Sequence, residues 1–149
     1  MHAIPAEEAT KALVGHEFPG GSYKIAHWEN FLLTGCTGAE PLPNGLAHPV
    51  ALFHVPIMGA GTSIAEMFEL GQAESQLSII PESYDWEIFQ SLKEEVEYDI
   101  SGAVVAAERR TNAQGQTYDW VQFCFDVRSP EGTLSARSTI TWQYTRNML

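Results

Sequence analysis

The sequence has few basic residues and only two cysteines. Eight Lys and Arg face nineteen Asp and Glu over 149 residues, which gives a net charge of −11 at pH 7. A protein that binds the phosphate backbone of nucleic acid needs a basic stripe, so no nucleic-acid partner is expected. Cys36 and Cys124 do not have the CxxC spacing of a zinc knuckle or a redox motif.

Long hydrophobic runs are also missing. No apolar stretch approaches the roughly 18 residues that a membrane-spanning helix needs, and residues 1–18 do not have the pattern of a signal peptide. No glycine-rich phosphate loop and no metal-ligating cluster can be identified. We therefore expect a cytoplasmic protein with no membrane partner, no metal and no redox cofactor.

The composition that is present is that of a globular protein, with 44% hydrophobic and 18% charged residues. The length predicts one domain over residues 1–149, with a flexible N-terminus at residues 1–12. The pattern changes near residue 72, because helix signals and Gly/Pro loops come before it and strand signals come after it.

Two helices are predicted before this change. Ser22 is predicted to cap the first, which runs to about Thr34 and places four apolar residues on one face: Ile25, Trp28, Phe31 and Leu32. The second is predicted from His48 to about residue 70, with Pro49 at the favoured first position. Pro56 is expected to interrupt this long, apolar helix, because proline lacks an N–H group and clashes with the preceding turn.

Period-two patterns dominate after residue 75. Residues 75–89 indicate one or two strands broken near Pro81, and residues 96–110, 118–128 and 134–144 predict an antiparallel meander with turns at 112–115 and 129–132. The order is helix, loop, helix, then four or five antiparallel strands. It predicts an α+β hotdog fold, in which an antiparallel curved sheet wraps around a central helix.

Three stretches resemble the MaoC-like branch of the hotdog superfamily, over residues 13–146. They are WENFLLTG, LAHPVALFHVPIMGAGTSIAEMFELG and YDWEIFQSLKEEVEYDISGAVVAAERR. This branch contains (R)-specific enoyl-CoA hydratases and 3-hydroxyacyl thioester dehydratases. The resemblance implies a ligand that is an acyl thioester on CoA or on a carrier protein, bound where two hotdog subunits meet as a homodimer or a heterodimer.

The usual catalytic motif of the family does not carry over. MaoC-type hydratases have a G-D-x-N-P-x-H motif, whose Asp and His jointly activate a water molecule. The aligned stretch here is GCTGAEP, which puts Cys36, Gly38 and Pro41 at the Asp, Asn and His positions. Three explanations remain open: a non-catalytic subunit that pairs with a catalytic one, chemistry that has moved to other residues, or ligand binding alone.

Four residues are candidates for displaced acid–base chemistry: His48, Glu66, Glu40 and His54. His48 precedes a predicted helix, whose dipole favours a neutral imidazole, but it could equally cap that helix. Glu66 lies among apolar residues, where burial would raise the pKa of its carboxyl, although a solvent-facing position is the alternative. Glu40 lies in a loop, and His54 points to another side of the helix than His48.

Six further residues are candidates for substrate binding. Gly59 and Gly61 could let a thioester approach backbone N–H groups, although close helix packing explains them equally well. Cys36 has no evident activating base, and we interpret it as a small buried residue rather than a nucleophile. Trp86 would provide either an acyl-chain wall or sheet packing. The full set is Cys36, Asn44, Gly45, Gly59, Gly61 and Trp86.

The sequence therefore predicts a MaoC-like hotdog protein that acts on or binds acyl thioesters. If it is active, we expect a hydro-lyase of the (R)-3-hydroxyacyl-CoA/ACP dehydratase or enoyl hydratase type that needs no cofactor. The alternatives are a non-catalytic acyl-binding subunit of a heteromeric dehydratase and a hotdog thioesterase.

Overall fold

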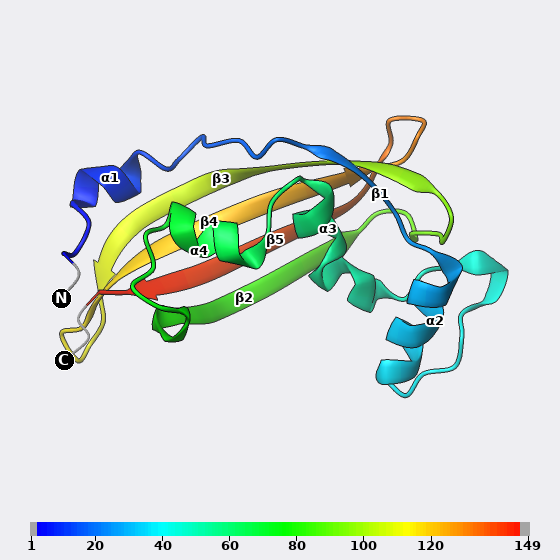
Figure 1. The fold of residues 1–149 in the computed structure, drawn as a ribbon, viewed down its shortest axis with the longest axis horizontal. Coiled ribbons are helices and arrows are strands. Elements are labelled where there is room, and N and C mark those ends of the chain that lie inside the picture. Colours follow the sequence, from blue (N-terminus) through cyan, green and yellow to red (C-terminus); the bar gives the residue numbers. More distant parts are fainter. Residues whose placement is uncertain (1–2, 147–149) are drawn as a thin grey trace.

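A curved, five-stranded antiparallel sheet forms the body of the protein, in a computed structural model that describes residues 3–146 (Figure 1). The strand order is β1-β3-β4-β5-β2. The predicted meander is confirmed, because β4 pairs with both β3 and β5 in antiparallel register. The strands are β1 (Gly21–Lys24), β2 (Ile79–Ile88), β3 (Glu97–Thr111), β4 (Thr117–Arg128) and β5 (Leu134–Thr145).

The predicted break near Pro81 is a register shift inside one strand rather than a gap between two. β2 pairs with β5 from Ile79 to Ile88, and the shift lies between Pro81 and Ser83. β2 is an edge strand, where a proline costs no ladder hydrogen bond on its open side.

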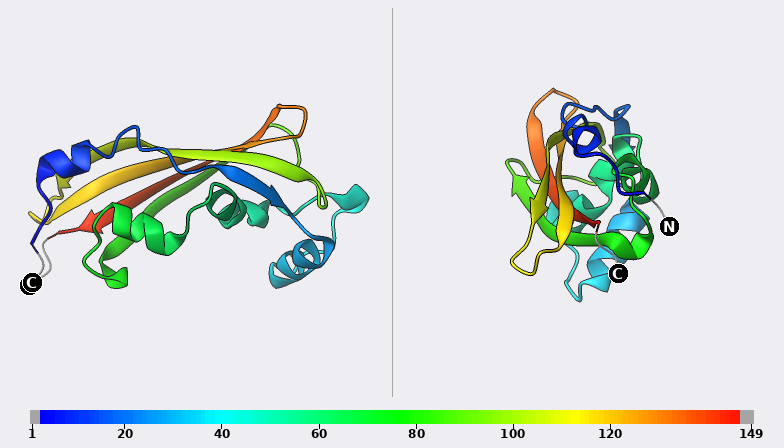
Figure 2. Two further views of the ribbon diagram at one scale, coloured as in Figure 1. Left: turned by 45° about the horizontal axis from the view of Figure 1, so that its top comes forward. Right: turned by 90° about the vertical axis from the view of Figure 1, so that its left-hand side faces the viewer.

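Short helices cover one face of the sheet and both of its ends. Figure 2 shows α3 and α4 on one face, with α1 near one end and α2 beyond the other. The helical segments are α1 (Glu7–Lys11), α2 (His27–Cys36), η1 (Pro43–Gly45), η2 (Pro49–Phe53), α3 (Val55–Gly59), α4 (Ile64–Leu70) and η3 (Gln76–Ser78).

The prediction of one long helix from residue 48 to residue 70 is wrong, because the segment forms three short pieces. η2 ends at Phe53, and α3 starts again with Pro56 in its first turn, where the missing N–H group costs nothing. Gly61 then has a φ of +78°, which ends α3, and the Ser63 hydroxyl caps α4 by accepting the Glu66 N–H. The interruption predicted at Pro56 therefore falls at the preceding junction, and a second break follows α3.

The first helix also starts later than predicted. Ser22 does not cap it but lies in β1, where its hydroxyl donates to Glu97. Of the four apolar residues assigned to one face, only Ile25 is buried, because α2 turns a different face inward, with Asn30 and Thr34 as its buried residues. Trp28, Phe31 and Leu32 are 67%, 59% and 57% exposed.

The hydrophobic core lies between the helix-covered face of the sheet and the segment 49–70. The period-two patterns place it well, because the inward residues of β4 and β5 are fully buried. They are Val121, Phe123, Phe125, Val127, Ala136, Ile140, Trp142 and Tyr144. Leu52, Val55 and Met67 cover them from the other side.

Gly71 shows how tightly α4 packs on β5. A Cβ atom at Gly71 would lie 2.3 Å from the ring of Tyr144, and this ring is held because its hydroxyl donates to the Met67 carbonyl at 2.6 Å. We expect Gly71→Ala to lower the free energy of unfolding by about 1–3 kcal/mol through overpacking, measured by urea denaturation. Gly35→Ala is the control: it lies in α2 with open space around it, so alanine there should be neutral or stabilising by about 0.5–1 kcal/mol. Equal effects of the two substitutions would contradict the packing argument.

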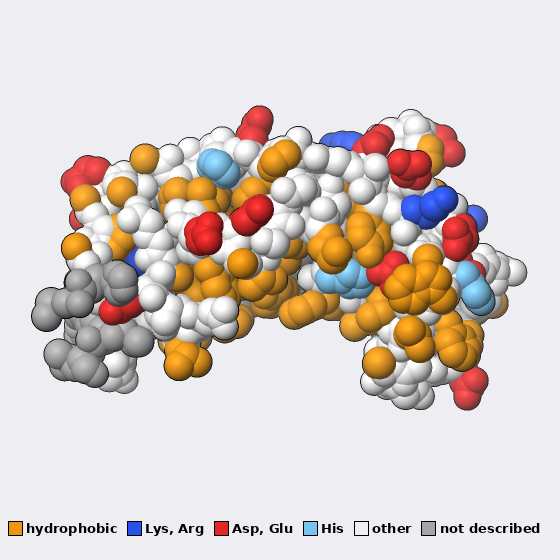
Figure 3. Space-filling model, viewed as in Figure 1, with side chains coloured by type: hydrophobic (Ala, Val, Ile, Leu, Met, Phe, Trp, Pro, Cys, Tyr) orange, Lys and Arg blue, Asp and Glu red, His pale blue; other side chains and the backbone are white. Residues whose placement is uncertain are grey.

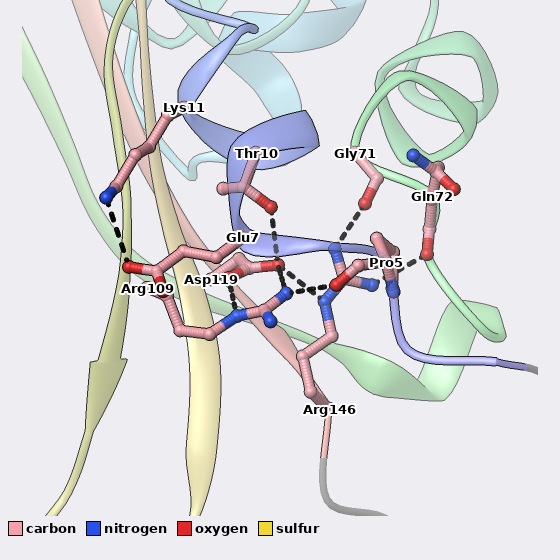
Figure 4. A network of polar contacts seen from close by, with 9 residues as sticks. All are labelled: Pro5, Glu7, Thr10, Lys11, Gly71, Gln72, Arg109, Asp119 and Arg146. Carbon is pink, nitrogen blue, oxygen red and sulfur yellow. Dashed lines mark hydrogen bonds and ion pairs between the residues drawn. The ribbon is translucent and has the colours of Figure 1, made fainter.

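A buried ion cluster around Asp119 joins both ends of the chain to the sheet (Figure 4). The Asp119 carboxylate accepts hydrogen bonds from Arg109, Arg146 and Thr10. The sequence predicted a flexible stretch at residues 1–12. Residues 1–2 lie outside the described residues, whereas α1 in this stretch is a formed helix with Thr10 buried. Arg146 also donates to the carbonyl of Gly71 at the end of α4.

Candidate functional site

Three titratable side chains from separate elements meet where α2 approaches the η2–α3 junction. Tyr23 comes from β1, Glu29 from the first turn of α2, and His54 from the residue between η2 and α3. The Tyr23 hydroxyl donates to Glu29 Oε2 at 2.6 Å, and His54 Nε2 lies 2.7 Å from the same oxygen. The Tyr23 and His54 rings are edge to face, with centroids 6.0 Å apart.

The local fold fixes the Glu29 carboxylate in this position. Glu29 is the third residue of α2, and its Oε1 accepts the Ala26 N–H at 3.3 Å. A carboxylate in the first turn also complements the positive end of the helix dipole. The pair is partly shielded from water, because the side chains of His54 and Glu29 are 28% and 14% exposed.

The protonation of the two oxygen acids follows from this geometry. Burial raises the pKa of Glu29, but the hydrogen bonds from Tyr23, His54 and the Ala26 backbone outweigh it and hold that pKa below its ordinary value. Burial and the hydrogen bond to Glu29 raise the pKa of Tyr23 to about 12. At neutral pH, Glu29 is therefore an acceptor and Tyr23 a donor.

The Glu29 carboxylate selects one tautomer of His54. An ionised carboxylate can only accept, so the imidazole must carry a proton on Nε2. No hydrogen bond to His54 Nδ1 occurs within residues 3–146, so no described protein group engages this nitrogen. A carboxylate on one imidazole nitrogen orients the ring and stabilises the positive charge that it gains when the other nitrogen takes a proton. The arrangement can therefore transfer a proton to and from a bound ligand.

Hydrophobic side chains surround this pair. Figure 3 shows a histidine beside an acidic side chain, with hydrophobic side chains around them over α3 and α2. Trp28 and Phe31 flank Glu29 in the sequence, Phe53 and Met58 lie on either side of His54 in the sequence, and all four are more than half exposed. An apolar surround of this kind suits an acyl group, and it also suits a second protein chain.

A second His–Glu pair lies in a different environment. His27 Nδ1 is 2.8 Å from Glu94 Oε1, but the His27 side chain is 74% exposed. The Glu94 carboxylate also accepts from the buried amide of Asn30, so this pair ties α2 to the loop before β3. This exposed His27–Glu94 pair is the comparison for the shielded His54–Glu29 pair.

His48 caps η2 in the structure. Its Nδ1 accepts the Val50 N–H at 3.0 Å, and its own backbone N–H donates to Asn30 Oδ1 at 3.0 Å. One ring nitrogen therefore caps the helix, which is the role that the sequence offered for His48 as the alternative to acid–base chemistry. His48 has no carboxylate partner within the described residues.

The two predicted acids lie at the surface and away from a histidine. Glu66 is exposed on α4 and accepts a hydrogen bond from the Thr62 hydroxyl at 3.2 Å, so the predicted apolar surroundings do not bury it. Glu40 is exposed in the loop between α2 and η1. Neither carboxylate is within salt-bridge distance of His48 or His54.

Three predicted binding residues also lie in exposed or turn positions. Cys36 is the last residue of α2 and is exposed, so its interpretation as a buried residue is wrong. The helix turns its outward face to water at this point. Asn44 and Gly45 form the turn η1 with φ values of +59° and +70°, which these residue types tolerate.

Gly59 and Gly61 have different local roles. A Cβ at Gly59 would lie 2.3 Å from Ile100 Cδ1, so its position supports the close-packing explanation. The Gly61 N–H donates to the Met58 carbonyl at 3.1 Å and is not free for a thioester. Trp86 lies on the helix-facing side of β2, with its indole N–H buried.

Sequence reasoning missed Tyr23 and Glu29. Glu29 stands in the stretch WENF between Trp28 and Phe31, and an acid enclosed by aromatic residues in a first turn is the signal that could have identified it. Tyr23 gave no such signal, because the β1 strand was interpreted as the start of a helix.

Other kinds of site find no support in the part of the chain that the structure describes. No group of three or more His, Cys, Asp or Glu could hold a metal ion there. No described helix is both long enough and apolar enough to cross a membrane. Arg109 is part of the Asp119 cluster, and Arg110 lies over the Trp120 ring, 4.1 Å from its centroid.

The sheet, its strand order and the helical segment packed inside it define a hotdog-fold protein, as predicted. The HadBC complex of Mycobacterium tuberculosis, a (3R)-hydroxyacyl-ACP dehydratase, matches with a TM-score of 0.67 and 7% identity, over 88% of this chain and 96% of that chain. The ChsH1–ChsH2 complex of M. tuberculosis matches with a TM-score of 0.67 and 9% identity, over 95% and 89% of the two chains. A MaoC-like dehydratase matches with a TM-score of 0.66 and 12% identity, over 91% of this chain and 43% of that one.

At such low identity these structures show the fold alone. No family model matches the sequence. No curated protein sequence matches it either.

Proposed function

We propose that this protein binds acyl thioesters and catalyses the reversible hydration of their 2,3-double bond, as an (R)-3-hydroxyacyl-CoA/ACP dehydratase or enoyl hydratase does. The observation that carries the proposal is the His54–Glu29 pair, which offers an oriented imidazole with one free nitrogen in an apolar surround. The hotdog fold and its dehydratase neighbours support this class of substrate.

In the hydration direction, His54 Nδ1 takes a proton from water while the water oxygen bonds to C3 of the enoyl thioester. The electron pair of the double bond moves to C2 and onto the thioester carbonyl. The protonated imidazole then returns the proton to C2, so one water molecule is added across the double bond and His54 is regenerated. Glu29 stabilises the imidazolium form throughout, and Tyr23 holds Glu29 in place.

The experiment is an assay of the purified full chain with crotonyl-CoA and longer enoyl-CoAs. Loss of the enoyl absorbance without release of free thiol is the expected result. Release of thiol without hydration would replace the proposal with a thioesterase. No reaction, alone or with a second hotdog subunit, would contradict catalysis by this chain.

A non-catalytic acyl-binding subunit of a heteromeric dehydratase is the second candidate. The observation that favours it is the placement of His48, Glu66 and Glu40, since one caps a helix and the two acids lie exposed. Two of the structural neighbours are described as complexes. Here a catalytic partner would supply the reaction, and His54→Ala in this chain would leave the activity of the pair unchanged.

The partner that we propose is a second hotdog chain, in the first instance another copy of this one. β2 is an edge strand with free backbone groups, and Ile80 and Ile88 on it are exposed. We expect the full chain to be a dimer and Ile80→Lys/Ile88→Lys to be a monomer, measured by size-exclusion chromatography with light scattering. Val105→Lys, at a similarly exposed residue on β3, should leave the dimer intact. A wild-type chain that stays monomeric at high concentration would contradict the homodimer.

A further inference from the structure

Two buried polar atoms on the helix-facing side of the sheet have no hydrogen-bond partner within residues 3–146. They are Trp86 Nε1 on β2 and Ser138 Oγ on β5. The two residues are directly paired across the strands, so their side chains leave the sheet on the same side. Ser138 is 0% exposed, between the equally buried Ala136 and Ile140 on its own strand face.

A third donor lies beside them. Tyr84 is two residues before Trp86 on the same face of β2. Its hydroxyl oxygen accepts the Trp142 indole N–H at 3.0 Å, but no acceptor for the Tyr84 hydroxyl proton occurs in the described part of the chain. The wall formed by β2 and β5 therefore presents three hydrogen-bond donors without acceptors: Tyr84, Trp86 and Ser138.

The two buried donors, Trp86 Nε1–H and Ser138 Oγ–H, are costly in an apolar wall. Most buried polar atoms in proteins are hydrogen-bonded, and leaving one unpaired costs free energy that an apolar residue would not. Alanine at position 138 would continue the pattern of Ala136 and remove an unpaired hydroxyl. A bound ligand with one acceptor atom would explain why both the Ser138 hydroxyl and the Trp86 indole N–H are present in this wall.

Tyr84 links this wall to the candidate site through one residue. Phe53, which is half-exposed, stacks on the Tyr84 ring with centroids 5.3 Å apart, and the next residue is His54. Beyond Trp86 on β2, Ile88 borders an apolar hollow that Leu42, Leu46 and Leu52 also line. An acyl group that starts at His54 would have to displace the Phe53 side chain to reach Trp86 and Ser138.

We propose that the acyl group carries an oxygen of its own, a keto or hydroxyl group distant from the thioester, and that Trp86 Nε1–H and Ser138 Oγ–H donate to it. The proposal rests on the proposed acyl-thioester binding and narrows its substrate class to oxygenated acyl groups. Tyr84 is the third donor and aligns the same oxygen from the neighbouring position of β2.

The test measures binding to the full chain by isothermal titration calorimetry. The probes are decanoyl-CoA and a series of decanoyl-CoAs with one keto group at successive carbons; all are saturated, so no reaction occurs. We expect one keto isomer to bind about tenfold or more tightly than decanoyl-CoA, which corresponds to about 1.4 kcal/mol. Ser138→Ala and Trp86→Phe should each reduce this preference, measured as the ratio of the affinities for the keto and plain probes, because each removes one donor to the keto oxygen.

Ser135→Ala is the matched control. Ser135 is also buried on β5, but its hydroxyl is hydrogen-bonded to Gln90 and to the Thr133 carbonyl. Its replacement should lower the melting temperature and leave the keto preference unchanged, whereas Ser138→Ala should raise the melting temperature by removing an unpaired hydroxyl.

Two results would overturn the inference. Equal affinity for plain and keto probes would show that no acceptor reaches the donors, while acyl-thioester binding would stand. Equal weakening of both probes by Ser138→Ala and Trp86→Phe would show that these residues only pack the wall. If no probe binds at all, acyl-thioester binding itself is contradicted. That result differs from equal binding of all probes, which contradicts only the contact to the acyl oxygen.

Discussion

Replacing His54 with alanine is expected to lower kcat for crotonyl-CoA hydration by about 10²–10⁴-fold, the usual contribution of a positioned acid–base group. The imidazole is the group whose free nitrogen can take a proton from water, and Glu29 holds its other nitrogen at 2.7 Å. The loss should appear in kcat rather than in KM, because the proton transfer occurs only in the transition state. The measurement is steady-state kinetics from the loss of enoyl absorbance.

The Glu29 carboxylate should matter through His54. Glu29→Gln keeps the size of the side chain but removes the charge that stabilises the imidazolium and fixes its tautomer. We expect a smaller loss of kcat than for His54→Ala, and the double variant should be no worse than His54→Ala alone, because the two residues act as a unit. Additive losses would contradict a shared role.

His27→Ala is the control for these variants. It removes a histidine that also bonds a glutamate, at 2.8 Å, but that is exposed to water. Hydration should be unchanged within about twofold, since the outward-facing His27–Glu94 pair contributes little. If His27→Ala lowers kcat as much as His54→Ala, the loss reflects damage to α2 and not acid–base chemistry.

The sheet could be predicted from the sequence because its signal is local. Val121, Phe123, Phe125 and Val127 alternate with partly exposed residues along β4, and all four are fully buried. Alternation determines which side chains face the core wherever one face of a sheet is covered. The turns at 112–115 and 129–132 then give the antiparallel order of β3, β4 and β5.

The helices were predicted less well because their burial depends on what lies opposite. Trp28, Phe31 and Leu32 have the spacing of a buried face but are exposed, since α2 projects beyond the end of the sheet. The long central helix was predicted from its apolar composition. The Gly61 conformation and the Ser63 cap divide it. Both effects outweigh the helix propensity of the apolar residues on either side.

The candidate site was predicted only in part because its contacts are long-range. His54 was among the candidates, but its partner Glu29 lies 25 residues earlier in the chain. Nothing in the local pattern of either residue shows that the start of α2 folds back against the η2–α3 junction. The unpaired Ser138 hydroxyl was likewise invisible, because a serine within a strand is ordinary until its surroundings are known.

Asp119→Asn is expected to lower the free energy of unfolding by about 3–5 kcal/mol, the usual cost of removing one member of a buried ion cluster. The Asp119 side chain is 0% exposed and bonds both Arg109 and Arg146, whose side chains are 19% and 4% exposed. A neutral amide would leave two shielded guanidinium groups without a counter-charge. Because domains are stable by only about 5–15 kcal/mol, the effect should be plain in urea denaturation at pH 7.

Asp126→Asn is a matched control on the same strand. Asp126 also faces two arginines, Arg137 at 2.7 Å and Arg128 at 3.8 Å, but its side chain is 24% exposed. Water screens these pairs, so the substitution should cost about 0–1 kcal/mol. The two substitutions remove the same charge beside the same number of arginines, so the main difference between them is the burial of the carboxylate.

The pH dependence gives a second, independent measurement on the same cluster. Burial raises the pKa of Asp119, but hydrogen bonds from Arg109, Arg146 and Thr10 outweigh it, so the folded-state pKa is below the ordinary value. A carboxyl with a lowered pKa stabilises the fold above its unfolded pKa of about 3.9, and this stability is lost as the pH falls through the folded value. The wild type should therefore lose stability below about pH 4 more steeply than Asp119→Asn, so the two curves should converge in acid. A constant difference from pH 7 to pH 3, or an Asp119→Asn variant as stable as Asp126→Asn, would show that this cluster does not anchor the two ends of the chain.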